Sequence, residues 1–152
     1  MIFRHGTTKL PVSDLQVYIQ QQLMLRPDTK IYIGIDSKAT VETCVYALVI
    51  AFRYSNNGVH YIYNKEYTAV PHSKWERLMN EIERLMNFTS WFKDNVPYTI
   101  HAVDVDVNEC KQHYSNRLHA IAVGWGHSLG VKVITKPHEV IASKAADYIV
   151  NH

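Results

Sequence analysis

The sequence predicts an α/β fold in which helices cover both faces of a mixed five-stranded sheet. Three strand-like segments come first with no long helix between them, which predicts an antiparallel meander. Helical and strand-like segments then alternate, which predicts parallel crossover connections. The 152 residues are 47% hydrophobic and 20% charged, as is typical of one domain with one core. We expect residues 1–152 to form this domain, with residues 1–29 as an N-terminal helical extension.

The strands are predicted from runs of β-branched and aromatic residues. The expected strands cover residues 31–36, 43–54, 59–67, 98–106 and 131–134. Turn-forming residues at 55–58 separate the second run from the third, which predicts a hairpin.

The helices are predicted from apolar residues that recur every three to four positions. The expected helices cover residues 13–25, 74–91, 115–130 and a last segment that begins at Pro137. The pairs Ser13 with Gln16 and Ser73 with Glu76 have the spacing of a capping box, so each pair predicts a helix start.

Charge and hydropathy exclude some classes of protein and leave others open. The net charge of +2 is only weakly basic, so charge alone does not identify a nucleic-acid-binding protein. The nine histidines lack the spacing of a zinc site. The longest apolar run, residues 44–52, is too short to span a bilayer, and no secretion signal is visible at the N-terminus. We therefore expect a cytoplasmic protein without a membrane segment.

Four acidic residues occupy positions that such a sheet would bring together. They follow the first strand, lie on the helix after the hairpin, end the fourth strand and lie on the last helix: Asp36, Glu81, Asp106 and Asp147. Carboxylate oxygens are preferred ligands of Mg²⁺ and Mn²⁺. A pair of these ions can activate water and stabilise the leaving oxygen of a phosphodiester. The sequence therefore predicts a site for two ions of Mg²⁺ or Mn²⁺.

Alternatives remain for two of these ligands. Asp104 lies on the same side of its strand as Asp106, because side chains alternate with a period of two. Glu76 and Glu83 share a helix with Glu81, although Glu76 is explained by helix capping. Lys38 and Lys136 flank the expected site and are candidates for phosphate contacts.

Several short motifs, taken together, resemble a known family. From Lys30 to the C-terminus they are Ile31-Tyr-Ile-Gly-Ile-Asp-Ser37, Trp75-Glu-Arg-Leu with Glu81, Asp106-Val-Asn108, Tyr114-Ser-Asn116, Gly130, Lys136-Pro137, Ala142-Ser143 and Ala146-Asp147. In this order and spacing, the chain resembles the YkuK-like family of predicted ribonuclease H-related nucleases.

The resemblance implies a ribonuclease H-like fold and a metal-dependent nuclease whose acidic positions match the four acids above. Its register favours Asp106 over Asp104. Lys38 stands where the family pattern has a glutamine and His138 where an acidic residue is common, so the substrate contacts are expected to differ. The expected substrate-binding residues are Lys38, Asn108, Ser115, Asn116 and Lys136.

The sequence therefore supports two hypotheses about function. The first is hydrolysis of RNA, DNA or an RNA·DNA hybrid by two metal ions: Asp36 would bridge the ions, Glu81 and Asp106 would complete one, and Asp147 would hold the other. The second is a non-catalytic module that binds nucleic acid or protein on the same fold.

Overall fold

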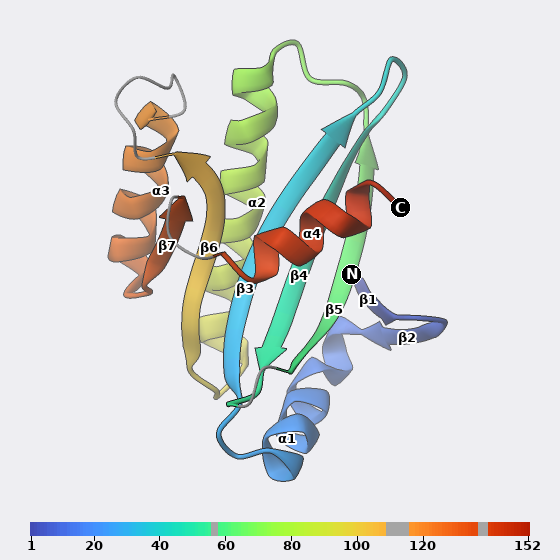
Figure 1. The fold of residues 1–152 in the computed structure, drawn as a ribbon, viewed down its shortest axis with the longest axis vertical. Helices are drawn as coiled ribbons and strands as arrows, with labels where there is room; N and C mark the ends of the chain where they lie inside the picture. The colour runs from blue at the N-terminus through green and yellow to red at the C-terminus, as the bar shows by residue number, and fades with distance from the viewer. Residues whose placement is uncertain (56–57, 109–115, 137–139) are drawn as a thin grey trace.

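A computed structural model describes residues 1–55, 58–108, 116–136 and 140–152. The strands form one sheet in the order β2-β1-β5-β4-β3-β6-β7 (Figure 1). The strands are β1 (Ile2–His5), β2 (Thr8–Pro11), β3 (Lys30–Ala39), β4 (Cys44–Arg53), β5 (Val59–Thr68), β6 (Ile100–Asn108) and β7 (Val133–Lys136). The α-helices are α1 (Leu15–Leu25), α2 (Lys74–Asn95), α3 (Asn116–Leu129) and α4 (Ala142–Val150). None of the helices in these described ranges combines the length and apolar character needed to cross a membrane.

The mixed α/β fold predicted from the sequence is confirmed. β3, β4 and β5 form the antiparallel meander, and β6 and β7 are added in parallel beside β3. The predicted number of five strands is wrong, because β1 and β2 extend the sheet to seven. These two strands have four residues each and bury only Phe3, so they lack the alternating apolar pattern that marks a longer strand.

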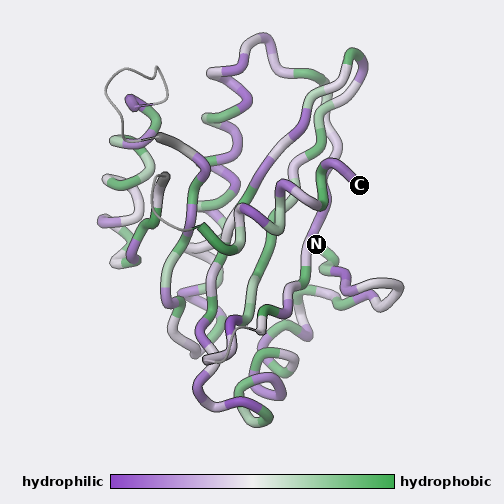
Figure 2. The backbone as a smooth tube through the Cα atoms, viewed as in Figure 1, coloured by the Kyte–Doolittle hydropathy of each residue, from purple (hydrophilic) through white to green (hydrophobic). Residues whose placement is uncertain are grey.

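The helices cover the two faces of the sheet separately. α2 and α3 pack on one face, where they share a core with the side chains of β3 and β4 that point that way. α4 crosses the other face and packs on β3 and β4 through small and branched residues (Figure 1). Hydrophobic residues run along β4 between these layers (Figure 2), as expected for a strand that is buried on both faces.

The capping predictions had different outcomes. At the start of α2, the hydroxyl of Ser73 accepts the N–H of Glu76 at 3.1 Å, and a Glu76 carboxylate oxygen accepts the N–H of His72 at 2.9 Å. The predicted capping box at Ser13 is wrong, because a short 3₁₀ helix occupies residues 12–14 and α1 begins at Leu15 without a side-chain cap.

Candidate functional site

The sheet brings Asp36 and Asp106 to neighbouring positions on parallel strands. β3 and β6 are paired in parallel at Gly34 and Asp104. Asp36 and Asp106 each lie two residues further along their strands, toward the carboxyl ends. Because alternate side chains share a face, both point to the face that α4 crosses.

The first turn of α4 is fixed to the sheet by Asp104. The two carboxylate oxygens of this buried residue accept the backbone N–H groups of residues 141–143, at N···O distances of 3.1, 2.8 and 2.5 Å. A carboxylate at this position also interacts favourably with the helix dipole. Burial raises the pKa of Asp104, although these hydrogen bonds oppose the shift. Asp104 therefore acts as the anchor of α4.

Gly34 allows the same turn of α4 to approach the sheet closely. A Cβ atom at Gly34 would lie 2.5 Å from the backbone nitrogen of Ser143 and 2.8 Å from Cβ of Ala142. Only glycine leaves room for this contact. Asp147 lies one turn further along α4, so Gly34 and Asp104 together determine where its carboxylate stands.

The carboxyl group of Asp36 interacts electrostatically with those of Asp147 and Asp106. Burial, followed by the interactions with Asp147 and Asp106, raises the pKa of Asp36 to about 7, although the N–H of Ser37 donates to its carboxylate at 2.8 Å and opposes the shift. The carboxyl group of Asp36 is thus surrounded mainly by other acids.

Glu81 approaches from α2, on the other face of the sheet. The hydroxyl of Ser37 donates a hydrogen bond to its carboxylate, and Arg77 donates to the carbonyl oxygen of Ser37 at 3.2 Å. Burial and the charges of Asp36 and Asp106 raise the pKa of Glu81 to about 8, against the lowering effects of Ser37 and Arg77. No spacing in the sequence indicates Ser37 or Arg77 as partners of Glu81.

The structure separates the acidic alternatives by their surroundings. Asp104 is occupied by the first turn of α4, and Glu76 is occupied by the start of α2. Glu83 is exposed on α2, whereas Glu81 is buried and interacts electrostatically with Asp36 and Asp106. The surroundings therefore favour Glu81 and Asp106 over their alternatives.

The predicted substrate-binding residues that the structure describes lie near the end of the sheet that carries the acids. Lys38 is exposed on β3, two residues beyond Asp36, and Asn116 begins α3. The backbones of Asn108 and Lys136 are neighbours at the ends of β6 and β7. Ser115, like His138, falls outside the described residues.

The chemistry of these acids fits divalent cations, but their present arrangement does not enclose one. All four side chains offer carboxylate oxygens, which Mg²⁺ and Mn²⁺ prefer. A bound cation would also offset the repulsion that raises the pKa of Asp36 and Glu81. Within the part of the chain that the structure describes, no three His, Cys, Asp or Glu side chains converge as they would around a metal ion.

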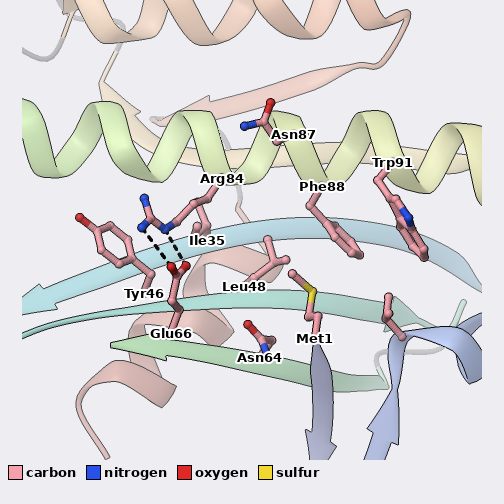
Figure 3. A pocket seen from close by; sticks show the side chains of 11 residues that line it. Met1, Ile35, Tyr46, Leu48, Asn64, Glu66, Arg84, Asn87, Phe88 and Trp91 are labelled. Carbon is pink, nitrogen blue, oxygen red and sulfur yellow. Dashed lines mark hydrogen bonds and ion pairs between the residues drawn. The ribbon is translucent and has the colours of Figure 1, made fainter. Parts of the chain in front are cut away.

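A separate cavity under α2 contains none of the predicted site residues. It has a volume of about 360 Å³ and lies between α2, the sheet and the N-terminal residues (Figure 3). Arg84 lines this cavity, and its Nε and Nη2 atoms donate to the two carboxylate oxygens of Glu66 at 2.8 and 3.2 Å. The guanidinium carbon of Arg84 also lies 4.1 Å from the ring centre of Tyr46. Since the charges in this cavity neutralise each other, the acidic end of the sheet is the stronger candidate site.

Comparisons with known proteins give one family and several distant structures. A family model described as Ribonuclease H-like matches residues 12–151, whereas no curated protein has significant sequence similarity to this chain. Endonuclease V from Ciona intestinalis, in complex with a 23mer DNA containing an inosine followed by a ribo-adenosine, is 17% identical with a TM-score of 0.45. That match covers 87% of this chain and 61% of the endonuclease, so this chain spans less than two thirds of that protein.

Two further structures are similarly distant. LC11-RNase H1 in complex with RNA/DNA hybrid is 15% identical with a TM-score of 0.42, over 80% of this chain and 94% of that one. NurA bound to dAMP and manganese is 9% identical with a TM-score of 0.26, over 64% and 26% of the two chains. At these identities and TM-scores, the likenesses carry no argument about activity.

Proposed function

Because the chain belongs to the ribonuclease H-like family, we propose that it is a metal-dependent nuclease that hydrolyses phosphodiester bonds of RNA, DNA or their hybrid. Family membership agrees with the resemblance in the sequence motifs. Since one fold can carry several chemistries, the proposal must rest on the site.

The observation that carries the proposal is the crowding of four carboxyl groups at one end of the sheet. Burial and mutual repulsion raise the pKa of Asp36 to about 7 and of Glu81 to about 8. Such crowding is costly in a protein without a function for it, and perturbed carboxyls of this kind cluster at functional sites.

In this proposal, Asp36, Glu81, Asp106 and Asp147 hold two ions of Mg²⁺ or Mn²⁺. When bound, such ions supply activation of the attacking water and neutralise the charge that develops on the phosphodiester. The remaining residues position the ligands: the Ser37 hydroxyl orients Glu81, and Arg77 holds the backbone of Ser37. The anchor at Asp104 sets the position of Asp147.

The test is cleavage of labelled RNA, DNA and RNA·DNA hybrid in the presence of Mn²⁺ or Mg²⁺. We expect the parent protein to cleave at least one of the three, and a double Asp36→Asn, Asp147→Asn variant to lose the activity. Asp94→Asn removes an exposed carboxylate near the other end of α2 and should cleave like the parent. Cleavage by the double variant at the parent rate would rule out this site.

One observation favours the second function, a non-catalytic module that binds nucleic acid or protein. Among the described residues, the acids do not converge around a single point. If the protein is such a module, we expect no cleavage of any substrate in the panel and no uptake of Mn²⁺ that depends on Asp36. If it is a nuclease, we expect cleavage of at least one substrate and Mn²⁺ uptake that depends on Asp36.

A further inference from the structure

The sheet leaves part of one face uncovered beside the acids. α4 crosses this face at an angle, and β3, β4 and β5 continue beyond it (Figure 1). The residues that point outward there include Lys38 on β3 and Lys65 and Tyr67 on β5. We call these three residues the strand platform.

The register of the strands connects the strand platform to the site. Asp36 is paired with Ala47, and Ala47 is paired with Lys65, so these three residues form one row across the sheet. The next row contains Lys38, Val45 and Tyr67. Neighbouring strands lie about 4.8 Å apart, which places the backbone of Lys65 about 10 Å from that of Asp36.

The alternation of β5 establishes that Lys65 and Tyr67 share the face of Asp36. Asn64 and Glu66 point to the α2 face, where Glu66 binds Arg84. Tyr63 packs with the core under α4. The odd-numbered positions of β5 therefore face the same side as Asp36 and Asp147.

The charges of the strand platform suit a polyanion. Within the described part of the chain, the ammonium groups of Lys38 and Lys65 form no hydrogen bond or ion pair. Glu66, the acid next to Lys65, is held on the opposite face by Arg84. Lys65 also lines a groove of about 380 Å³ between β5 and the end of α4, and no acidic side chain lines that groove. These ammonium groups can therefore contact phosphates without first breaking an internal ion pair.

Tyr67 indicates which kind of nucleic acid fits. The residue is 66% exposed, so most of its surface is available for contact with a ligand. An exposed ring beside free ammonium groups can stack on a base, but only when that base is unpaired and splayed from its neighbours. In a duplex the bases already stack on one another inside the helix.

We propose that the strand platform binds single-stranded nucleic acid as it leaves the acid cluster, with Lys38 and Lys65 on phosphates and Tyr67 stacked on a base. This inference deepens the proposed nuclease function. It rests on that function in one respect: the bound nucleic acid is assumed to run from the strand platform toward Asp36. It makes the substrate of that site a single strand, or a single-stranded end or flap.

The test measures binding without catalysis. Labelled single-stranded RNA and DNA, and the matching duplexes, are titrated with the parent protein in the presence of a chelator, with fluorescence anisotropy as the readout, at a series of salt concentrations. We expect the parent to bind single strands more tightly than duplexes. Tyr67→Ala should weaken single-strand binding about fivefold or more, whereas Tyr67→Phe, which keeps the ring, should bind like the parent.

The salt dependence separates phosphate contacts from stacking. Lys65→Ala should reduce the slope of log K against log salt by about 0.7, the value for one phosphate contact to a single strand. Tyr67→Ala should leave this slope unchanged. Lys132→Ala is the matched control, because it also removes one positive charge, but from an exposed residue that lies before β7, at the opposite end of the parallel strands.

The outcomes distinguish this inference from the proposed function. Equal binding of single strands and duplexes, or parent-like binding by both Tyr67→Ala and Lys65→Ala, would overturn the strand platform even if the protein cleaves nucleic acid. Single-strand binding that depends on Tyr67 and Lys65, without cleavage in Mn²⁺, would support the strand platform and reject the nuclease. A parent protein that binds no nucleic acid would overturn both.

Discussion

Asp104 and Asp36 lie on the same face of the sheet, where Asp104 is fully buried and Asp36 is partly buried. The groups that surround the two carboxyls differ. Asp104 accepts three backbone N–H groups from the first turn of α4. Asp36 accepts one N–H and otherwise meets the carboxyl groups of Asp147 and Asp106. The hydrogen-bonding capacity of Asp104 is thus satisfied by α4, whereas Asp36 is surrounded mainly by other carboxyl groups.

This difference separates structural from functional acids better than burial does. Burial raises the pKa in both places, so a raised pKa alone would select Asp104 as readily as Asp36. The hydrogen-bond partners distinguish them, because a carboxylate whose acceptor positions are filled by backbone N–H groups has little capacity left for a ligand.

The largest effect is expected when the anchor is removed. Asp104→Ala leaves the N–H groups of residues 141–143 buried without their acceptor, which should lower the free energy of unfolding by about 3 kcal/mol. Urea unfolding measures this loss. Asp36→Asn, measured beside it without metal, should not be destabilised, because it removes a charge from a repulsive cluster. A larger loss for Asp36→Asn than for Asp104→Ala would reverse the comparison.

A smaller loss is expected at Gly34, where the anchor depends on close approach. Gly34→Ala places a Cβ atom 2.5 Å from the backbone of Ser143, and the resulting shift of α4 should cost about 2 kcal/mol. Gly124→Ala is the matched control on α3, because a Cβ atom there meets nothing within 4 Å and alanine favours a helix by up to about 1 kcal/mol. A change of stability in the same direction in both variants would contradict the close contact between α4 and Gly34.

The smallest effect concerns the pH dependence of the metal-free protein. The folded-state pKa values of Asp36 and Glu81, about 7 and about 8, lie above the unfolded value of about 4. The folded protein therefore holds protons that the unfolded chain releases, so the contribution of these groups to stability falls as pH rises from about 4 to 8.

We expect this fall to be on the order of 1 kcal/mol after allowance for solvent and side-chain relaxation. Urea unfolding at several pH values with a chelator present measures it. Asp36→Asn should show a shallower dependence than the parent, and Asp94→Asn the same dependence. Stability that instead increases over this range in the parent, relative to Asp36→Asn, would contradict the crowding of the acids.

Sequence patterns predicted most of the fold because β3 to β5 and the helices α2 and α3 are long and strongly patterned. β1 and β2 were missed because strands of four mostly exposed residues carry almost no periodic signal. α4 was expected from Pro137, but the described helix begins at Ala142, where the N–H groups bound by Asp104 mark its start.

The acids could be assigned to one end of the sheet from the order of the strands alone. Sequence spacing could not separate Asp104 from Asp106, because both point to the same face and only the contact with α4 distinguishes them. The close approach at Gly34 had a sequence signal, since a glycine inside a β-branched strand often marks a backbone contact. The partners Ser37 and Arg77 had none, because their contacts with Glu81 join elements far apart in the chain.

The most direct test of the acid cluster is calorimetric titration with Mn²⁺ of the parent, Asp36→Asn and Asp94→Asn proteins. Since metal binding requires deprotonated carboxylates, the titration is made near pH 8. We predict saturable uptake by the parent and by Asp94→Asn, with affinity reduced at least tenfold in Asp36→Asn. Equal affinity in all three proteins, or no uptake by the parent, would contradict the assignment of these acids as a metal site.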